Sequence, residues 1–408
     1  MRCLLLVLSI LYFPLSGNGQ TSRKVSPIIC HANPYEERQI PLNHLSFRNQ
    51  ALSTFEFRFA ANVPLAAQRA MEFAADIWAQ HLVSEVPIVI EVSWERFEEE
   101  NVLASAGPNS LYRDFSFKAE RDIWYPVALA EAILGENINE DEPDLSIIAN
   151  SQQDWYFGLD GRVPFGDIDL VSVILHELGH GLGFLSSADL NEDGQGELGY
   201  DARNLIFDEF LETSSGSQLA DPVRFPSPSF QLRNAYTQNT LFFGSNAAAG
   251  FNRGRFPELY TPRSFEQGSS ISHLDEAAFP AGSGNALMSP RLGFREAVHE
   301  PGDVSLSIME AIGWETGANR VVTNTQEASL SEISVYPNPC RDQFTVQWVD
   351  NFGNQASYQI LDGMGRVLQS GPLETNPNIR VQQMAPGTYF LRLFNQVENH
   401  LQKLVIIR

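Results

Sequence analysis

The segment from Val173 to Phe184 constrains the fold of this 408-residue chain more than any other part of the sequence. Its apolar residues recur at helical spacing, and a helix is predicted to begin near Asp169. His176 and His180 stand four residues apart, so both imidazoles lie on one face of that helix. This spacing lets the two imidazoles bind one tetrahedral Zn²⁺ while Glu177 faces the attacking water. The pattern predicts a zinc site with Glu177 as the catalytic base.

A third zinc ligand is expected elsewhere, because a catalytic zinc usually takes three protein ligands and keeps one position for water. Ser186 stands where the extended motif HExxHxxGxxH has its third histidine, so that motif is incomplete. Four histidines precede the core, end an earlier helix or lie near the C-terminus: His31, His44, His81 and His400. His273 and His299 remain as candidates. A carboxylate, Glu209 or Glu212, is the alternative, although both also fit the solvated face of a helix.

The segment around His273 is followed by Asn285–Pro290, which contains Met288, and then by an amphipathic stretch at 304–314. This order resembles leishmanolysin-like metzincins, in which the third histidine comes from a distant segment and precedes a methionine turn beneath the metal. The resemblance covers roughly residues 50–316. Three further segments resemble uncharacterised bacterial secreted proteins that carry the same HELGHGLGF signature: Ala70–Trp94, Trp155–Gly161 and Phe207–Leu211.

The resemblance implies a secreted zinc-dependent endopeptidase that hydrolyses protein or peptide substrates with a metal-activated water. Its implied residues are the zinc ligands His176, His180 and His273, the base Glu177 and the turn methionine Met288. One alternative is a non-proteolytic, zinc-containing surface adhesin or binding module of the same fold. Another is a zinc hydrolase that acts on other esters or amides. An intact Glu177 favours an enzyme over the binding module.

A second metal is predicted just after the motif helix. Asp189, Asn191, Asp193 and Glu197 place oxygen ligands at close spacing, as at the start of a Ca²⁺ loop. Tyr200 stands where the EF-hand pattern needs a glutamate, so the full motif is absent. A plain surface turn is the alternative.

The remaining periodicity predicts an α+β fold, and the resemblance implies a metzincin-like domain with a twisted sheet and an active-site helix. Alternating phenylalanines predict a strand that begins at Thr54, and helical spacing predicts helices at 64–82 and 127–134. Further strands are expected at 86–94 and 145–150. In metzincins an edge strand above the cleft pairs with the extended substrate, and by analogy residues 145–150 are expected to be that strand.

The domain organisation follows from changes in composition along the chain. An apolar run after Met1 and Arg2 is typical of a cleavable secretory signal and is too short to span a bilayer. The predicted boundaries are a signal peptide at 1–19, an N-terminal arm or pro-segment at 20–48, a metallopeptidase domain at 49–317, a linker at 318–331 and a C-terminal domain at 332–408. Cys30 is a candidate latency switch, a buried residue or a partner of Cys340.

Residues 332–408 contain short alternating runs broken by turns, which predict a small all-β, immunoglobulin-like sandwich. Four motifs in this part resemble a type A sorting domain of the type IX secretion system: Val335–Pro339, Gly365–Val367, Pro386–Tyr389 and Lys403–Arg408. The resemblance implies a Gram-negative source, passage through the periplasm, contact with the type IX secretion machinery, and a secreted or cell-surface location. A generic carbohydrate- or protein-binding sandwich is the alternative.

Composition excludes several classes of partner. Hydrophobic residues at 43% and charged residues at 19% are ordinary for a globular protein. The net charge of −23 repels nucleic acid and anionic lipid. After removal of the signal, no transmembrane segment is expected in the mature chain.

Overall fold

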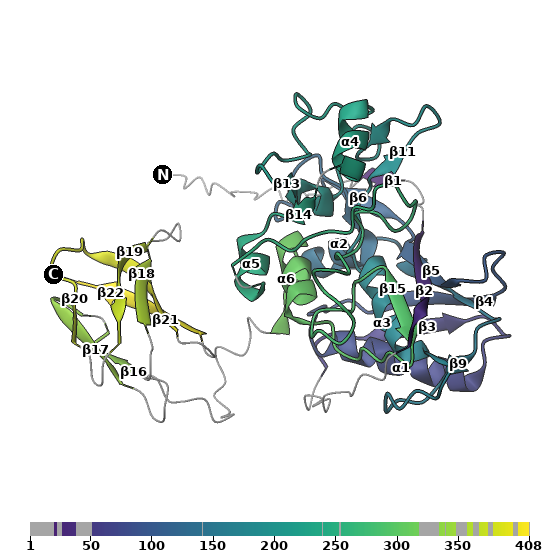
Figure 1. Cartoon of the computed structure of the whole chain (residues 1–408), viewed down its shortest axis with the longest axis horizontal. Coiled ribbons are helices and arrows are strands. Elements are labelled where there is room, and N and C mark those ends of the chain that lie inside the picture. The colour runs from purple at the N-terminus through teal and green to yellow at the C-terminus, as the bar shows by residue number, and fades with distance from the viewer. Residues whose placement is uncertain are drawn as a thin grey trace, which may run out of the picture. The chain divides into compact units, whose positions relative to one another are not determined.

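The computed structural model describes residues 20–22, 27–37, 51–140, 142–238, 240–252, 254–317, 334–338, 340–347, 357–361, 367–373, 378–394 and 399–407. The chain divides into two compact units, Met1–Val322 and Thr323–Arg408 (Figure 1). The predicted signal peptide and linker lie outside the described residues. None of the helices in the described part of the chain is long and apolar enough to cross a membrane.

The first unit mixes helices and strands, as the predicted α+β class requires. Its elements in chain order are β1 (Gln20–Ser22), β2 (Ile28–Glu37), β3 (Phe55–Phe59), α1 (Leu65–Ala79), β4 (Ile88–Glu95), β5 (Val102–Pro108), β6 (Leu111–Arg113), β7 (Tyr125–Pro126), α2 (Val127–Leu134), β8 (Leu145–Asn150), β9 (Trp155–Tyr156), β10 (Ile168–Asp169), α3 (Leu170–Gly181), β11 (Asp189–Leu190), β12 (Gly196–Glu197), η1 (Ile206–Phe210), β13 (Leu211–Thr213), α4 (Phe230–Gln238), β14 (Leu241–Phe243), α5 (Asn246–Phe251), β15 (Arg291–Phe294) and α6 (Asp303–Ile312). The predicted helices at 64–82 and 127–134 are confirmed as α1 and α2.

A six-stranded sheet organises this unit, in the order β15-β2-β5-β8-β4-β3. Strands β3, β4 and β8 run parallel, and β5 runs antiparallel to β8. Strand β2 lies between β5 and β15, antiparallel to the first and parallel to the second. The strand predicted to begin at Thr54 is β3, which begins at Phe55, but it is not the first regular element, because β2 in the predicted N-terminal arm also belongs to the main sheet.

The prediction that residues 145–150 form the edge strand is also wrong. These residues form β8, whose backbone is paired with β4 on one side and with β5 on the other. A strand with both sides paired has no free hydrogen-bonding groups for a substrate. The order of strands across a sheet differs from their order along the chain. Strand β5 precedes β8 in the chain and pairs with the side of β8 that β4 does not occupy.

Helices α1 and α3 pack together beneath the sheet and share one apolar core with it. The indole nitrogen of Trp78 on α1 donates to the carbonyl oxygen of Leu175 on α3 at 2.8 Å, and the Trp78 side chain is fully buried. The Asp169 carboxylate caps α3 by accepting the amide hydrogen of Ser172. The helix that carries the predicted ligands is therefore fixed at its start and along its length.

In the residues that the structure describes, the second unit is all β. It contains β16 (Ser334–Tyr336), β17 (Gln343–Gln347), β18 (Ser357–Leu361), β19 (Val367–Pro372), β20 (Asn378–Arg380), β21 (Gly387–Phe394) and β22 (Asn399–Ile406). They form two antiparallel sheets, β16-β17-β20 and β19-β18-β21-β22. One apolar cluster draws on both sheets, including Phe344 from the first and Leu391 from the second. The all-β prediction is confirmed, and the immunoglobulin-like topology stays a prediction.

Candidate metal centre

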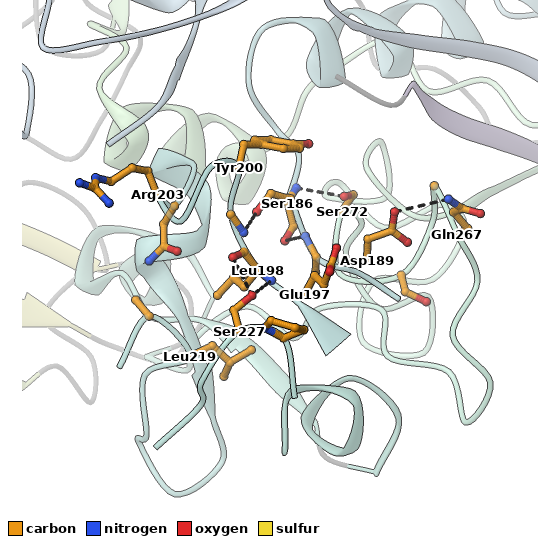
Figure 2. A pocket seen from close by; sticks show the side chains of 18 of the residues that line it. Ser186, Asp189, Glu197, Leu198, Tyr200, Arg203, Leu219, Ser227, Gln267 and Ser272 are labelled. Carbon is orange, nitrogen blue, oxygen red and sulfur yellow. Dashed lines mark hydrogen bonds between the residues drawn. The ribbon is translucent and has the colours of Figure 1, made fainter. Parts of the chain in front are cut away.

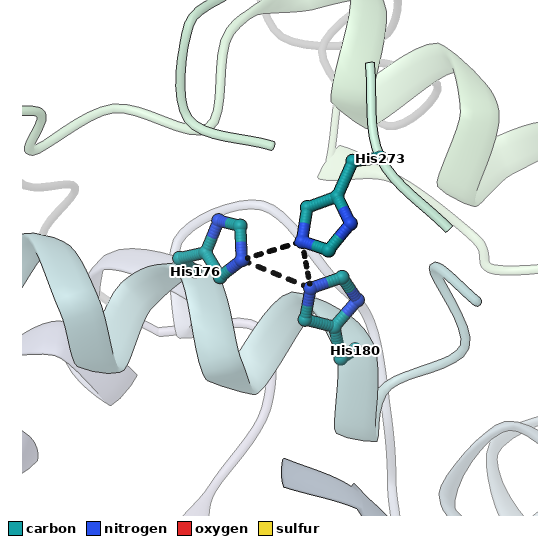
Figure 3. Close-up of side chains that lie close together, drawn as sticks. All are labelled: His176, His180 and His273. Atoms are coloured by element: carbon teal, nitrogen blue, oxygen red, sulfur yellow. Dashed lines mark hydrogen bonds between the residues drawn. The ribbon is translucent and has the colours of Figure 1, made fainter. Parts of the chain in front are cut away.

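Helix α3 presents His176 and His180 on the same face, one turn apart, as the spacing predicts (Figure 3). Every residue of α3 is buried, so these two imidazoles are surrounded by protein rather than by water. The helix ends where Gly183 adopts a φ of +121°, a conformation that favours glycine. The chain then turns back, and the amide hydrogen of Ser186 is donated to the hydroxyl oxygen of Ser272, the residue before His273.

His273 completes a triangle with the two helical histidines, although it lies 93 residues beyond His180. The Nε2 atoms of His176 and His180 are 2.9 Å apart. The Nε2 atom of His273 lies 3.2 Å from each of the other two (Figure 3). These three side chains form a group that could hold a metal ion, and all three are buried.

Each ring uses its other nitrogen to bind a backbone carbonyl. The Nδ1–H groups of His176, His180 and His273 donate to the carbonyl oxygens of Leu287, Phe184 and Ser269, each at 2.7 Å. A carbonyl oxygen only accepts, so the proton of each neutral ring sits on Nδ1 and Nε2 carries a bare lone pair. The same contacts fix the orientation of the rings, as second-shell partners of metal ligands do.

Burial keeps all three rings neutral. It lowers the pKa of His176 to about 4 and the pKa values of His180 and His273 well below their usual value. Three lone pairs that converge without a proton between them repel each other, and a bound cation removes that repulsion. The donor set therefore fits a metal that prefers imidazole nitrogen.

Glu177 lies beside this triangle and is fully buried. Neither of its carboxylate oxygens has a hydrogen-bond partner among the described residues. Burial raises the pKa of Glu177 well above the usual value. Burial of an isolated carboxylate costs folding free energy. The Glu177 carboxylate is therefore suited to a function in which a bound ligand or substrate supplies its interaction partner.

Cys30 lies close to Glu177 and to His176, one corner of the triangle. Its Sγ atom, a carboxylate oxygen of Glu177 and a ring nitrogen of His176 all lie within 4.8 Å of one another. Burial raises the pKa of the thiol, and the negative charge of Glu177 adds to this effect. Cys30 and Cys340 are both free and buried, Cys30 in the first unit and Cys340 in the second.

Met288 packs directly beneath the helix at Gly179, between His176 and His180. A β-carbon at Gly179 would lie 2.7 Å from the Sδ atom of Met288, so the glycine allows this close approach. The amide hydrogen of Leu274 is donated to the carbonyl oxygen of Met288 at 2.8 Å, which ties the methionine segment to the residue after His273. Residue 287 of the same segment supplies the carbonyl that orients His176.

The alternative ligands lie elsewhere. The Nε2 atom of His299 is 2.7 Å from the Oδ2 atom of Asp169, and both residues are buried. His299 therefore contacts the N-terminal cap of α3 and does not belong to the group of three histidines. Glu209 accepts a hydrogen bond from the side-chain amide of Asn204, and Glu212 lies against Gly244. The metal-binding groups found among the described residues do not include either glutamate.

The predicted calcium residues form a hairpin. Asp189 and Glu197 are opposite each other in the β11–β12 pair, and the Asn191 side chain accepts the amide hydrogen of Gln195. The metal-binding groups found in the described part of the chain do not gather Asp189, Asp193 and Glu197. Calcium binding stays a prediction, and the turn itself is satisfied by its own hydrogen bonds.

A pocket of about 1270 Å³ is lined by Ser272, the residue before His273, and by Pro27, Ile28, Ile29 and His31 at the start of β2. Figure 2 shows Ser186 and Ser272 together on this wall, with Asp189 hydrogen-bonded to Gln267 nearby. Buried Asp208 supports the wall by accepting hydrogen bonds from Ser186, Ser187 and the amide of Leu205. Burial raises the pKa of Asp208 to about 6.

Two parts of the site were not identified from the sequence. The carbonyls that orient the histidines belong to Leu287, Phe184 and Ser269, and a backbone group leaves no signal in residue type. The position of Cys30 beside Glu177 depends on β2 joining the sheet, and the segment from 28 to 37 has little strand periodicity.

Two family models match parts of the chain. Residues 334–407 match a family described as secretion system C-terminal sorting domain. Residues 48–212, which include α3, match a family described as SPBPB7E8-like. No curated protein matches the chain. The first match confirms the sorting-domain prediction: the protein is exported by type IX secretion to the cell surface or the extracellular space, and the type IX machinery is its partner.

Proposed function

We propose that the first unit is a zinc-dependent endopeptidase, with His176, His180 and His273 as zinc ligands and Glu177 as the base. One observation carries the proposal. Three neutral imidazoles direct bare Nε2 atoms toward one point beside a buried carboxylate that has no hydrogen-bond partner among the described residues. A purely structural group of histidines would instead use its Nε2 atoms in hydrogen bonds to other groups.

Zinc fits this donor set better than magnesium or calcium, which prefer oxygen ligands. Two nitrogens bound to one tetrahedral zinc lie about 3.3 Å apart, given Zn–N bonds of about 2.0–2.1 Å. The separations here are 2.9–3.2 Å, so shifts of a few tenths of an ångström suffice. Three protein ligands leave a fourth position open for water, as catalytic zinc sites do.

Bound zinc supplies a Lewis acid that lowers the pKa of a water toward ~7 and polarises a carbonyl oxygen. Glu177 moves the protons. Its unpartnered carboxylate oxygens accept a proton from the attacking water, and the carboxyl group then donates it to the nitrogen of the departing amine.

The arrangement around the ligands supports a metzincin-like assignment for this unit. The third histidine comes from a segment far from the helix, and Met288 packs beneath the helix between the first two ligands. The two sheets of the second unit, with their shared core, support the immunoglobulin-like assignment. We further propose that the sorting domain is removed on export, with release of the peptidase or its attachment at the cell surface.

The test compares purified full-length protein with its Glu177→Gln variant, using unfolded casein as the substrate and elemental analysis for metal. We expect one zinc per chain in both proteins, chelator-sensitive cleavage by the wild type, and at least a ~10²-fold lower rate in the variant. Glu209→Gln is the matched control, because Glu209 is a half-buried carboxylate outside the centre. Equal cleavage by the Glu177→Gln variant would remove Glu177 from the role of base.

A second candidate is a zinc-containing binding module without proteolysis. The observation that favours it is that β2 of the same chain lies against the centre. Bound zinc with no cleavage in any form of the protein, including forms in which this strand has been displaced, would support the binding module over the peptidase.

A further inference from the structure

His273 belongs to no helix or strand, whereas His176 and His180 are placed by α3. Two hydrogen bonds hold its position. Its ring donates from Nδ1–H to the carbonyl oxygen of Ser269 at 2.7 Å, and its own carbonyl oxygen accepts the amide hydrogen of Tyr260 at 2.9 Å. The third corner of the centre is therefore only as well fixed as Ser269 and Tyr260 are.

Ser269 is fixed by a tight turn that begins at Glu266. The carbonyl oxygen of Glu266 accepts the amide hydrogens of Ser269 at 3.1 Å and of Ser270 at 2.9 Å. The hydroxyl oxygen of Ser270 in turn accepts the amide hydrogen of Glu266 at 2.9 Å. The carbonyl group that orients the His273 ring thus belongs to a turn whose first residue, Glu266, has a charged side chain.

The Arg291 side chain joins this turn to Tyr260. Its Nη2 atom lies 3.2 Å from the Oε2 atom of Glu266 and donates to the Tyr260 hydroxyl oxygen at 3.2 Å. The Tyr260 hydroxyl donates to the Oε1 atom of Glu266 at 3.1 Å, which closes a triangle of three side chains. The guanidinium carbon also lies over the Tyr260 ring, 5.6 Å from its centroid, at a distance typical of a cation–π contact.

Arg291 also reaches the chain beyond His273. Its Nη1 atom lies 3.7 Å from the Oε2 atom of Glu276, and Glu276 follows His273 in the sequence while Glu266 precedes it. The guanidinium is one-third exposed, so a single ion pair of this kind would contribute little. Several partners around one planar group form a network instead, and a lysine ammonium cannot reproduce that geometry.

We propose that Arg291 is a positioning residue for the third zinc ligand. Its guanidinium joins Tyr260, Glu266 and Glu276, and these three residues hold the His273 segment from both sides. Arg291 acts through them, by fixing the Ser269 carbonyl that orients the His273 ring and the Tyr260 amide that holds the His273 backbone. The inference rests on the metal centre of the proposed function and does not depend on cleavage of a substrate.

The first experiment measures the zinc affinity of the full-length protein and of its Arg291→Gln variant by competition with a chromophoric chelator. We expect the variant to bind zinc about tenfold more weakly, at the lower end of the cost of losing a second-shell partner, because Arg291 acts through intermediate residues. Arg291→Lys should lie between the two, since it keeps the charge without the planar fork. Unchanged zinc affinity in Arg291→Gln would overturn the proposal.

Arg113→Gln is the matched control. Arg113 also lies over an aromatic ring, that of Trp124, and also pairs with a carboxylate, Asp122, but neither partner contacts the histidines through a hydrogen bond that the structure shows. Its loss should lower the urea midpoint and leave zinc affinity unchanged. Without denaturant both variants are almost fully folded, so lower stability alone does not weaken binding. An equal loss of zinc affinity in Arg113→Gln would reduce Arg291 to a general stabilising residue.

Glu266→Gln serves if Arg291→Gln does not fold. It removes the charged partner of the guanidinium and leaves the backbone of the turn intact. We expect this variant to keep the circular dichroism of the wild type and to bind zinc several-fold more weakly. Wild-type zinc affinity in folded Glu266→Gln would count against the network.

A coupling measurement ties the effect to His273. Arg291→Gln is introduced into His273→Ala and into His176→Ala, and the affinity is measured for Cu²⁺, which binds nitrogen ligands more tightly than zinc does. The change should weaken binding in His176→Ala, where His273 is still a ligand, and should have no effect in His273→Ala. Equal weakening in both backgrounds would show that Arg291 does not act through His273.

These affinities separate the role of Arg291 from the peptidase proposal. If the wild type binds zinc but cleaves no casein, the peptidase proposal fails, and the affinities still decide the role of Arg291. If the wild type cleaves casein and Arg291→Gln binds zinc as tightly as the wild type does, the positioning role fails and the peptidase proposal stands.

Discussion

The Nε2 atoms of His180 and His273 lie 3.2 Å apart, although 93 residues separate them in the chain. His180 is fixed by helix α3, whereas His273 is fixed by contacts that its own segment makes with the loop after α3 and with Met288. The third corner of the centre therefore depends on the folding of the whole region between the two histidines.

His273→Ala is predicted to abolish stoichiometric zinc binding while the protein stays folded. The substitution removes one of three nitrogen ligands, and loss of a ligand should weaken binding by more than the ~10–100-fold that loss of a second-shell partner costs. Elemental analysis after dialysis measures the zinc, and circular dichroism checks the fold.

His299→Ala is the matched control for that prediction, because His299 was the other candidate for the third ligand. It should keep one zinc per chain and lose stability instead. The loss should be about 1–3 kcal/mol, since Asp169 is left buried without this partner. Loss of zinc in His299→Ala, with zinc retained in His273→Ala, would reverse the assignment of the third ligand.

Gly179→Ala is predicted to have opposite effects in two backgrounds. Alanine in a helix is favoured over glycine by about 1 kcal/mol, but a β-carbon here meets the Sδ atom of Met288 at 2.7 Å. Overpacking of this kind costs about 1–3 kcal/mol, so the change should destabilise the wild type. In a Met288→Ala background the space is free, and the same change should stabilise. Urea unfolding of the four proteins gives the double-mutant cycle, and simple additivity would show that the two residues do not meet.

The sequence predicted the parts of this protein that depend on local patterns. His176 and His180 follow from helical spacing, and α2 and β8 were predicted with their observed boundaries. His273 was reached by eliminating other histidines and by a resemblance, because no local pattern links it to α3.

The remaining features could not be predicted because they depend on pairing between strands that are distant in the sequence. Strand β2 contains Pro34 and lacks an alternating pattern. Backbone hydrogen bonds hold it between β5 and β15, two strands that lie far from it in the sequence. Nothing in the residues of β8 shows that β5 pairs with it, so the sequence alone is compatible with an edge position for this strand. The relation between Cys30 and Glu177 follows from this pairing, so it became visible only in the structure.

Asp208→Ala is predicted to destabilise the loop that joins α3 to the His273 segment. Asp208 is fully buried and accepts hydrogen bonds from Ser186, Ser187 and the amide of Leu205. Removal of the carboxylate leaves buried donors unsatisfied, so we expect a loss of about 3 kcal/mol or more in unfolding free energy. Zinc affinity should also fall, because Ser186 contacts the residue before His273.

Glu209→Ala is the control for Asp208, since it removes the neighbouring carboxylate, which has one side-chain partner, Asn204. Its cost should stay near 1 kcal/mol, the net value of about one hydrogen bond. Equal losses in the two variants, measured by chemical denaturation, would mean that the Asp208 contacts do not hold the loop.

Glu131 is predicted to make the stability of the first unit fall as pH rises. Burial raises its pKa to about 7 from 4.5, and its Oε1 atom accepts the amide hydrogen of Ile138. The folded state binds this proton more tightly than the unfolded state, so the stabilising contribution is full below the unfolded pKa and is lost as pH rises through about 7. Relative to Glu131→Gln, the wild type should therefore lose unfolding free energy between about pH 5 and pH 8, whereas exposed Glu136→Gln should follow the wild type. A constant difference between wild type and Glu131→Gln across that range, in urea denaturation at each pH, would show that the Glu131 carboxyl titrates alike in both states.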